Sequence, residues 1–170
     1  MKYVKTFEDF LLEWVNYVDQ YTPDEIATIE EYQGWSRSLN KQIATDSLDA
    51  GNQALMKRLD KIIAKSKNKT TQNQVVYRGV FNRKRYQEYL DMDGQTIVYK
   101  PFLSTSEDAN IAKDFGKDTV EIQLKAGTPF IFLTDDSEFK ELTDEKEVLL
   151  PRNLKFLVSV KDKNVIFKQI

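Results

Sequence analysis

The hydrophobic positions in the first third of the chain repeat every three or four residues, which is the spacing of a helix with one buried face. The motif Thr22-Pro23-Asp24-Glu25 marks a helix start, because it places a capping hydroxyl before a first-turn proline and a glutamate. We predict helices over 6–18, from 22 onwards, over 36–44 and over 49–65, so that residues 1–66 form a helical N-terminal part.

From residue 74 the apolar positions alternate, as they do in strands with one buried face. Strands are predicted at 75–80, 96–106, 120–125, 129–133, 147–151, 154–160 and 164–170. Short helices are predicted at 83–90 and 107–115, the second capped by Ser106 and ended by Gly116. Helices first and strands afterwards indicate an α+β fold in which 74–170 forms a β-rich core.

The chemistry available to the chain is limited by its composition. A chain of 170 residues accommodates a single domain, 1–170, with a sizeable core. It contains no Cys and no His, which excludes disulfides, thiolate nucleophiles and Ser-His-Asp catalysis and argues against a zinc site. The six glycines form neither a GxGxxG motif nor a P-loop, so no Rossmann or Walker nucleotide site is predicted. Carboxylates, Arg, Lys, Ser, Thr and Tyr, or a bound cofactor, must supply any reaction.

The N-terminal segment does not have the pattern of a signal peptide, because Glu8 and Asp9 interrupt its apolar run. No stretch of the sequence approaches the length of a membrane span. We therefore expect a cytoplasmic protein without membrane contact, unless a dedicated secretion machine or a virion carries it.

The net charge of −2 is distributed unevenly. Residues 57–85 carry 10 basic residues and 1 acidic residue, whereas residues 1–56 carry 4 basic and 10 acidic residues. The basic segment 57–85 could face an acidic partner or RNA. A solvated helix face followed by a loop is the alternative interpretation.

Two polar stretches interrupt apolar strands. Arg78 lies among apolar neighbours in VVYRGV, where a buried guanidinium is costly unless it is paired. It either points outward on an edge strand or grips a phosphate or carboxylate with both of its arms. In FLSTS, Ser104 and Thr105 could close a turn, and Ser104 could instead hold another side chain by a hydrogen bond. A serine nucleophile is disfavoured because the chain has no histidine to activate it.

Glu145 and Glu147 lie two positions apart at the start of the predicted strand EVLLP. In a strand, residues i and i+2 point to the same side, so the two carboxylates would share one space. A solvated strand end that carries a charge cluster is the simpler interpretation of this segment.

Taken in order, the motifs V-Y-R-G, F-x-S-T-S and E-x-E-V-L-L-P resemble the R-S-E class of mono-ADP-ribosyltransferases. That class includes the catalytic domains of clostridial binary toxins and small enzymes of T4-like phages. The resemblance covers residues 75–160, and the segment 22–40, with Tyr32-Gln33-Gly34 and Leu39-Asn40, is similar to the helices that precede the first strand in this family. It implies a split β-sandwich with NAD, a substrate and not a cofactor, in the cleft between the two sheets.

The resemblance also implies a role for each site residue. Glu147 would hydrogen-bond the nicotinamide ribose and stabilise the positive charge that forms as nicotinamide leaves. Glu145 would orient and deprotonate the acceptor guanidinium, the mark of arginine-modifying members, and Ser104 would position Glu147. The residues expected to bind NAD are Arg78, on its phosphates, and Gly79, Ser104, Thr105 and Phe115. Phe115 could alternatively be a core residue that closes the helix.

Three positions depart from the family pattern. Gly79 follows Arg78, whereas some toxins carry a second arginine there, and Pro101 stands where some members have an NAD-contacting Asn. In the loop 134–144 Phe139 is the only aromatic residue, and we assign it to target recognition. These departures concern recognition of the substrates more than the chemistry.

The sequence therefore predicts a monomeric, NAD-consuming enzyme that modifies an arginine of a host protein, with a component of the transcription or translation machinery as the expected acceptor. An NAD glycohydrolase and a catalytically silent binding module are the alternatives. The retained Glu145 argues against the first alternative, and the intact set of Arg78, Ser104 and Glu147 argues against the second. A phage enzyme acting in the bacterial cytoplasm is the favoured origin, with a secreted effector or the catalytic piece of a toxin as the other origins.

Overall fold

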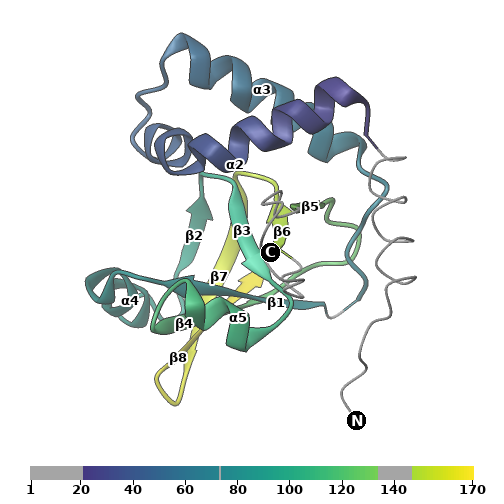
Figure 1. Ribbon diagram of the computed structural model, residues 1–170. Coiled ribbons are helices and arrows are strands. Elements are labelled where there is room, and N and C mark those ends of the chain that lie inside the picture. Colours follow the sequence, from purple (N-terminus) through teal and green to yellow (C-terminus); the bar gives the residue numbers. More distant parts are fainter. Residues whose placement is uncertain (1–20, 73, 134–146) are drawn as a thin grey trace.

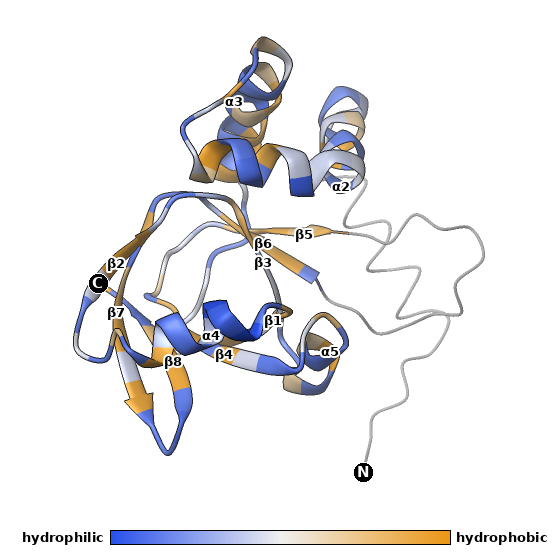
Figure 2. Ribbon diagram, turned by 90° about the vertical axis from the view of Figure 1, so that its left-hand side faces the viewer, coloured by the Kyte–Doolittle hydropathy of each residue, from blue (hydrophilic) through white to orange (hydrophobic). Residues whose placement is uncertain are grey.

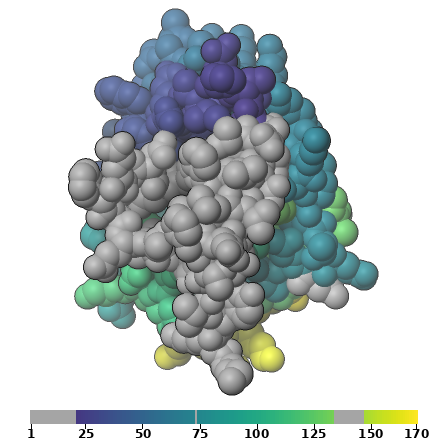
Figure 3. Space-filling model, turned by 45° about the vertical axis from the view of Figure 1, so that its right-hand side comes forward, coloured from purple at the N-terminus to yellow at the C-terminus, as the bar shows by residue number. Residues whose placement is uncertain are grey.

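The computed structural model describes residues 21–72, 74–133 and 147–170. Within these ranges a layer of two helices lies above a sheet of strands, as Figure 1 shows. The same layer forms the upper part of the face seen in Figure 3. The predicted helix over 6–18 and the predicted site residues Phe139 and Glu145 lie outside the described residues.

The helical layer consists of α2 (Pro23–Ala44) and α3 (Ala50–Lys65). Helix α2 starts at the predicted motif, where the backbone N–H of Thr22 donates to Glu25 Oε2 at 2.9 Å. It then runs without a break, so the separate helix predicted over 36–44 is wrong. The apolar stripe of α2 continues through Leu39 and Ile43. Their burial outweighs the cost of about 1 kcal/mol for a glycine inside a helix, which here is Gly34.

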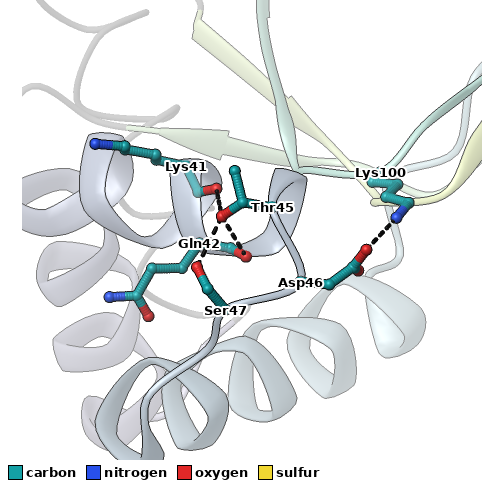
Figure 4. Close-up of polar contacts among 6 residues, drawn as sticks. All are labelled: Lys41, Gln42, Thr45, Asp46, Ser47 and Lys100. Carbon is teal, nitrogen blue, oxygen red and sulfur yellow. Dashed lines mark hydrogen bonds and ion pairs between the residues drawn. The ribbon is translucent and has the colours of Figure 1, made fainter.

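The C-terminal end of α2 also ties the helical layer to the sheet (Figure 4). The hydroxyl of Thr45 donates to the carbonyl of Lys41 at 3.0 Å and lies 2.7 Å from the hydroxyl of Ser47. Asp46, with a φ of 52°, turns the chain and accepts a bond from Lys100 Nζ at 2.6 Å. Helix α3 is tied down in the same way, because Arg152 Nε lies 2.9 Å from both carboxylate oxygens of Asp60.

In the described part of the chain, eight strands form a sheet in the order β2-β7-β8-β4-β1-β3-β6-β5. The strands are β1 (Val75–Val80), β2 (Thr96–Tyr99), β3 (Leu103–Ser106), β4 (Asp118–Gln123), β5 (Ile131–Leu133), β6 (Glu147–Leu150), β7 (Leu154–Lys161) and β8 (Asn164–Gln169). Two short helices, α4 (Arg83–Leu90) and α5 (Ala109–Asp114), interrupt them. The predicted α+β class, with helices first and a β-rich part afterwards, is confirmed.

The single strand predicted over 96–106 is in fact two strands that belong to different parts of the sheet. β2 pairs with β7, whereas β3 pairs with β6 and contacts β1. Between them lie Lys100, Pro101 and Phe102. A proline has no N–H for the ladder, and it restricts the residue before it, so the chain leaves one pairing here and enters another.

The link between β1 and β3, which we call the seam, is narrow. Only one pair of residues, Tyr77 and Ser106, is in register across it, whereas β1 and β4 align over all six residues of β1. The sheet is therefore continuous, but it narrows between a five-stranded half (β2-β7-β8-β4-β1) and a three-stranded half (β3-β6-β5). The resemblance implied two separate sheets, and the structure shows them as two halves of one sheet that are joined at the seam.

The two halves are covered by different helices. Figures 1 and 2 show α2 and α3 on the side of β3 and β6, and α4 and α5 beside β1 and β4. The helical layer shares a core with the three-stranded half, through Phe102, Ile131 and Leu149. A second core joins residues of the five-stranded half, such as Val76, Phe156 and Phe167, to residues of the three-stranded half, such as Leu103 and Val148.

Two glycines allow α5 to approach β1 closely. A Cβ on Gly79 would lie 2.1 Å from the carbonyl oxygen of Ala112, and a Cβ on Gly116 would lie 2.4 Å from the carbonyl carbon of Val80. Helix α5 is capped by Asp108, which accepts from Asn110 N at 2.7 Å, so the predicted Ser106 cap is wrong. The Ser106 hydroxyl instead accepts from the N–H of Asp108 at 3.1 Å and shapes the turn before the helix.

Candidate active site

A cleft of about 980 Å³ lies at the seam, lined by residues of α2, β1, β3, α4, α5 and β6. Its volume is at the upper end of the range for small-molecule sites. Because its walls come from both halves of the sheet, groups far apart in the sequence face a common space. Arg78, Gly79, Ser104, Thr105, Phe115 and Glu147, all the described residues of the predicted site, line it.

Arg78 lies on β1, which has neighbours on both sides, so the interpretation as an outward residue on an edge strand is wrong. Its Nη1 donates to the carbonyl oxygen of Ser104 at 2.7 Å, across the seam. The guanidinium carbon lies 5.9 Å from the ring centroid of Tyr99, within the range of a cation–π contact. The hydrogen bond to the Ser104 carbonyl uses one of the five N–H donors of Arg78. The half-buried guanidinium is therefore oriented and keeps donors for an anion.

Ser104 belongs to a chain of polar groups that reaches into the helical layer. Its hydroxyl lies 3.4 Å from the hydroxyl of Tyr32, which also accepts from Asn40 Nδ2 at 3.1 Å. Tyr32 is completely buried, and its ring meets that of Phe102 edge to face at 5.9 Å. Burial raises the pKa of Tyr32 despite its hydrogen bonds to Ser104 and Asn40, so its hydroxyl stays protonated at neutral pH.

Glu147 is the first residue of β6 and lies directly opposite Ser106 on β3. Ser104 is two residues along β3, so the register makes it a diagonal neighbour of Glu147 on the same face of the sheet. Glu147 is half-buried and close enough to Tyr32 for its charge to contribute to the raised pKa of that tyrosine, to which burial contributes most. The role of Ser104 in positioning Glu147 stays a prediction.

The remaining predicted residues differ in how they meet the cleft. Phe115 ends α5 with 56% of its surface exposed, so the alternative interpretation as a core residue is wrong. Thr105 is buried, and its hydroxyl donates to the carbonyl of Val148 at 3.0 Å, which gives it a structural bond between β3 and β6. Gly79 lines the cleft at the point where α5 approaches β1.

The family model for the ADP-ribosyltransferase exoenzymes matches residues 9–168. The chain belongs to this family. Among solved structures, it is similar to Plx2a, an ADP-ribosyltransferase toxin from Paenibacillus larvae, with a TM-score of 0.70 and 16% identity over 94% of this chain and 92% of the toxin. C3stau2 from S. aureus, solved with NAD, gives a TM-score of 0.68 at 18% identity, over 99% of this chain and 97% of that one. The Clostridium limosum C3 exoenzyme gives 0.68 at 19%, over 97% and 94%.

These structural likenesses show the fold of the ADP-ribosyltransferase exoenzyme. No curated protein matches its sequence. The family match does not extend to the acceptor, so membership of the R-S-E class, arginine specificity and likeness to phage enzymes stay predictions. Across residues 21–72, 74–133 and 147–170, no helix combines the length and apolar character needed to cross a bilayer.

The structure adds residues to the site of the exoenzyme to which the sequence assigned no role in the site. Tyr32 and Asn40 are eight residues apart, just over two helical turns, so both lie near one face of α2. Their polar groups beside an apolar stripe were the signal that could have found them. Arg85 and Tyr89, one helical turn apart on α4, and Tyr99 on β2 also line the cleft. Apart from the place of Arg85 in the basic segment 57–85, no local signal pointed to these three residues, because contacts between separate elements place them there.

Proposed function

We propose that the protein is an NAD-dependent mono-ADP-ribosyltransferase that transfers ADP-ribose to an arginine of a target protein and releases nicotinamide. The observation that supports this most is the convergence of Arg78, Ser104 and Glu147 on one cleft from three different strands. Glu145 and Glu147, on either side of Lys146, form the E-x-E pattern expected of arginine-modifying members.

Each residue has a task that its chemistry suits. Arg78 would hold the phosphates of NAD, because a planar guanidinium matches phosphate oxygens in two-point contacts. The carboxylate of Glu147 would stabilise the positive charge on the ribose as the bond to nicotinamide breaks and its electron pair leaves with nicotinamide. An arginine nitrogen of the acceptor then forms the new bond to the ribose carbon. Glu145 would take the proton that this nitrogen loses.

The two alternatives remain distinct from this proposal. In an NAD glycohydrolase, water replaces the acceptor, and the reaction then has no need of Glu145. In a silent binding module, the cleft would bind a partner without chemistry, and the set of Arg78, Ser104 and Glu147 would have no reason to converge. The target is expected to be a host protein, and the enzyme is expected to act as a monomer.

Six of the ten basic residues in the segment 57–85 fall into three groups in the structure. Arg58 Nη2 lies 2.6 Å from Glu31 Oε2, and Lys65 pairs with Glu25, so these two cations hold α3 against α2. The hydrogen bond from Lys65 holds the pKa of Glu25 below its usual value. Arg78 and Arg85 line the cleft. Lys57 and Lys61 are exposed on α3, where an acidic acceptor surface or RNA would be able to contact them.

The test separates the two glutamates. The wild type, Glu145→Gln and Glu147→Gln are incubated with labelled NAD, once alone, once with a small guanidine compound and once with bacterial lysate, and the modified side chains are identified by mass spectrometry. Glu145→Gln should abolish arginine modification, a general-base contribution of about 10²–10⁴-fold, and leave slow NAD hydrolysis. Glu147→Gln should remove both activities.

Three results would overturn the proposal. Label on a side chain other than arginine would exclude the arginine specificity. Hydrolysis without transfer, unaffected by Glu145→Gln, would show a glycohydrolase. NAD binding without turnover in the wild type would show a silent module.

A further inference from the structure

NAD carries two phosphates, but β1 supplies only one cation to the cleft. The neighbouring position on β1 is Gly79, and any side chain there would collide with the backbone of α5, because even its Cβ would lie 2.1 Å from the carbonyl oxygen of Ala112. A second cation therefore has to come from another element. Among the described residues that line the cleft, the other cations are Arg37 on α2 and Arg85 on α4.

Arg85 is held in place by two contacts on its own helix. Its Nη1 lies 2.9 Å from Glu88 Oε2, and its guanidinium carbon lies 5.6 Å from the ring centroid of Tyr89. This arrangement repeats that of Arg78, whose guanidinium has one hydrogen-bonded oxygen and one tyrosine ring, Tyr99. An arginine held by a ring and an acceptor loses less freedom when it binds an anion.

The two arginines share one neighbourhood. Burial raises the pKa of Tyr89, the nearby Tyr99 adds to that rise, and the charges of Arg85 and Arg78 oppose it. Both arginines are thus close enough to Tyr89 to act on its hydroxyl, and both line the same cleft. Arg37 approaches the cleft from the helical layer, and no ion pair or ring contact holds it among the described residues.

We propose that Arg85 is a second phosphate-binding residue of the cleft, which acts with Arg78 on the pyrophosphate of NAD and is oriented by Tyr89 and Glu88. This inference rests on the proposed use of NAD. It assigns the pyrophosphate to the five-stranded half of the sheet and its α4 helix, opposite the carboxylate of Glu147.

Helix α4 offers a matched control. Arg83 lies two residues before Arg85 on the same helix, is also exposed, and lines a separate depression with Tyr86, Gln87 and Lys163. Arg83→Gln therefore removes the same charge from the same helix without touching the cleft. Arg85→Lys keeps the charge of Arg85 but loses the planar fork that binds two oxygens at once.

The experiment measures equilibrium binding of NAD, ADP and adenosine by calorimetry to the full chain and to Arg85→Gln, Arg85→Lys, Arg83→Gln and Arg37→Gln, after thermal unfolding has shown that each variant is folded. Arg85→Gln should weaken the binding of NAD and of ADP by about 10–100-fold, which is the contribution of a hydrogen bond to a charged group. The binding of adenosine should be unchanged. Arg85→Lys should recover part of this loss. In turnover, Arg85→Gln should raise KM and leave kcat nearly unchanged, because the pyrophosphate is bound equally before and during the reaction.

The outcomes distinguish this inference from the function on which it rests. A wild-type protein that binds no NAD overturns both. A wild-type protein that binds NAD while Arg85→Gln behaves as Arg83→Gln overturns the role of Arg85 alone. An equal loss for ADP and adenosine, or a loss in Arg37→Gln in place of Arg85→Gln, also overturns it.

Discussion

The two halves of the sheet carry different groups into the same cleft. The five-stranded half, with its helix α4, brings the cations Arg78 and Arg85 and the tyrosine rings beneath them. The three-stranded half brings Ser104 and the carboxylate of Glu147. In the function that we propose, one half binds the anionic pyrophosphate and the other stabilises the developing positive charge.

The halves also differ in what supports them. The three-stranded half shares its core with α2 and α3, and Ser104 contacts Tyr32 of α2. The five-stranded half packs on the second core, to which the three-stranded half also contributes Leu103, Val148 and Leu150, and it is further supported by the close contact of α5 with β1. The N-terminal helices are therefore part of the catalytic unit, because they hold the half that carries Glu147.

The largest effect is expected from Glu147→Gln, which removes the charge of the three-stranded half and keeps its shape. Transfer and NAD hydrolysis should both fall by about 10²–10³-fold or more, since the lost electrostatic stabilisation acts on the transition state. NAD binding should persist through the arginines of the other half. Glu121→Gln, on β4 and outside the cleft, is the control. Near-normal turnover of Glu147→Gln would remove Glu147 from the mechanism.

The second prediction concerns the support of the five-stranded half. Gly79→Ala should lower the free energy of unfolding by about 1–3 kcal/mol, because the added Cβ pushes α5 away from β1. Gly34→Ala, in open space on α2, should raise it by about 0.5–1 kcal/mol. Urea unfolding measures both. If Gly79→Ala is as stable as Gly34→Ala, the close approach of α5 and β1 is wrong.

A smaller effect is expected from Tyr32→Phe, which keeps the ring against Phe102 and removes the hydroxyl near Ser104. Stability should fall by about 0.5–1.5 kcal/mol. Turnover should fall more than NAD affinity, since Ser104 belongs to the half that carries Glu147. Tyr86→Phe loses a comparable hydroxyl bond, to the carbonyl of Lys163, at a residue that does not line the cleft, and should leave turnover unchanged. Equal effects of the two variants on turnover would show that Tyr32 serves only the fold.

The smallest effect is expected on the helical layer. Arg58→Gln breaks an exposed ion pair with Glu31 and should lower the free energy of unfolding by about 0–1 kcal/mol, without any change in NAD binding or hydrolysis.

Reversal of Lys57 and Lys61 to Glu should likewise leave NAD hydrolysis unchanged. It should weaken the modification of an acidic acceptor and flatten the salt dependence of that modification. Acceptor titrations at several salt concentrations check this. A loss of hydrolysis in the reversed variant would mean that this face supports the catalytic unit.

Local signals predicted a helix or strand well where the whole signal lay within that one element. The strand over 75–80 and the helix over 83–90 have their predicted bounds, and Asn82 caps that helix by accepting from Lys84 N at 2.9 Å. The helix predicted over 49–65 starts after its cap, Asp49. The errors fell where pairing with distant segments decided the outcome. The break within 96–106 follows from two different strand partners, and the continuity of α2 follows from the core that it shares with α3 and the sheet.

The sequence by itself determined the class of the fold and the order of most of its elements, because these depend on periodicity. It also determined the three residues whose motifs resemble a known family, because a motif depends on residue types in a given order. Only the tertiary structure decided that Arg78 bonds the backbone of Ser104, that Tyr32 lies behind Ser104, and that Arg85 enters the same cleft. It also decided why position 79 is a glycine, since the atom that forbids a side chain there belongs to Ala112. Such contacts join residues far apart in the chain, and no local pattern records which distant segment will pack against which.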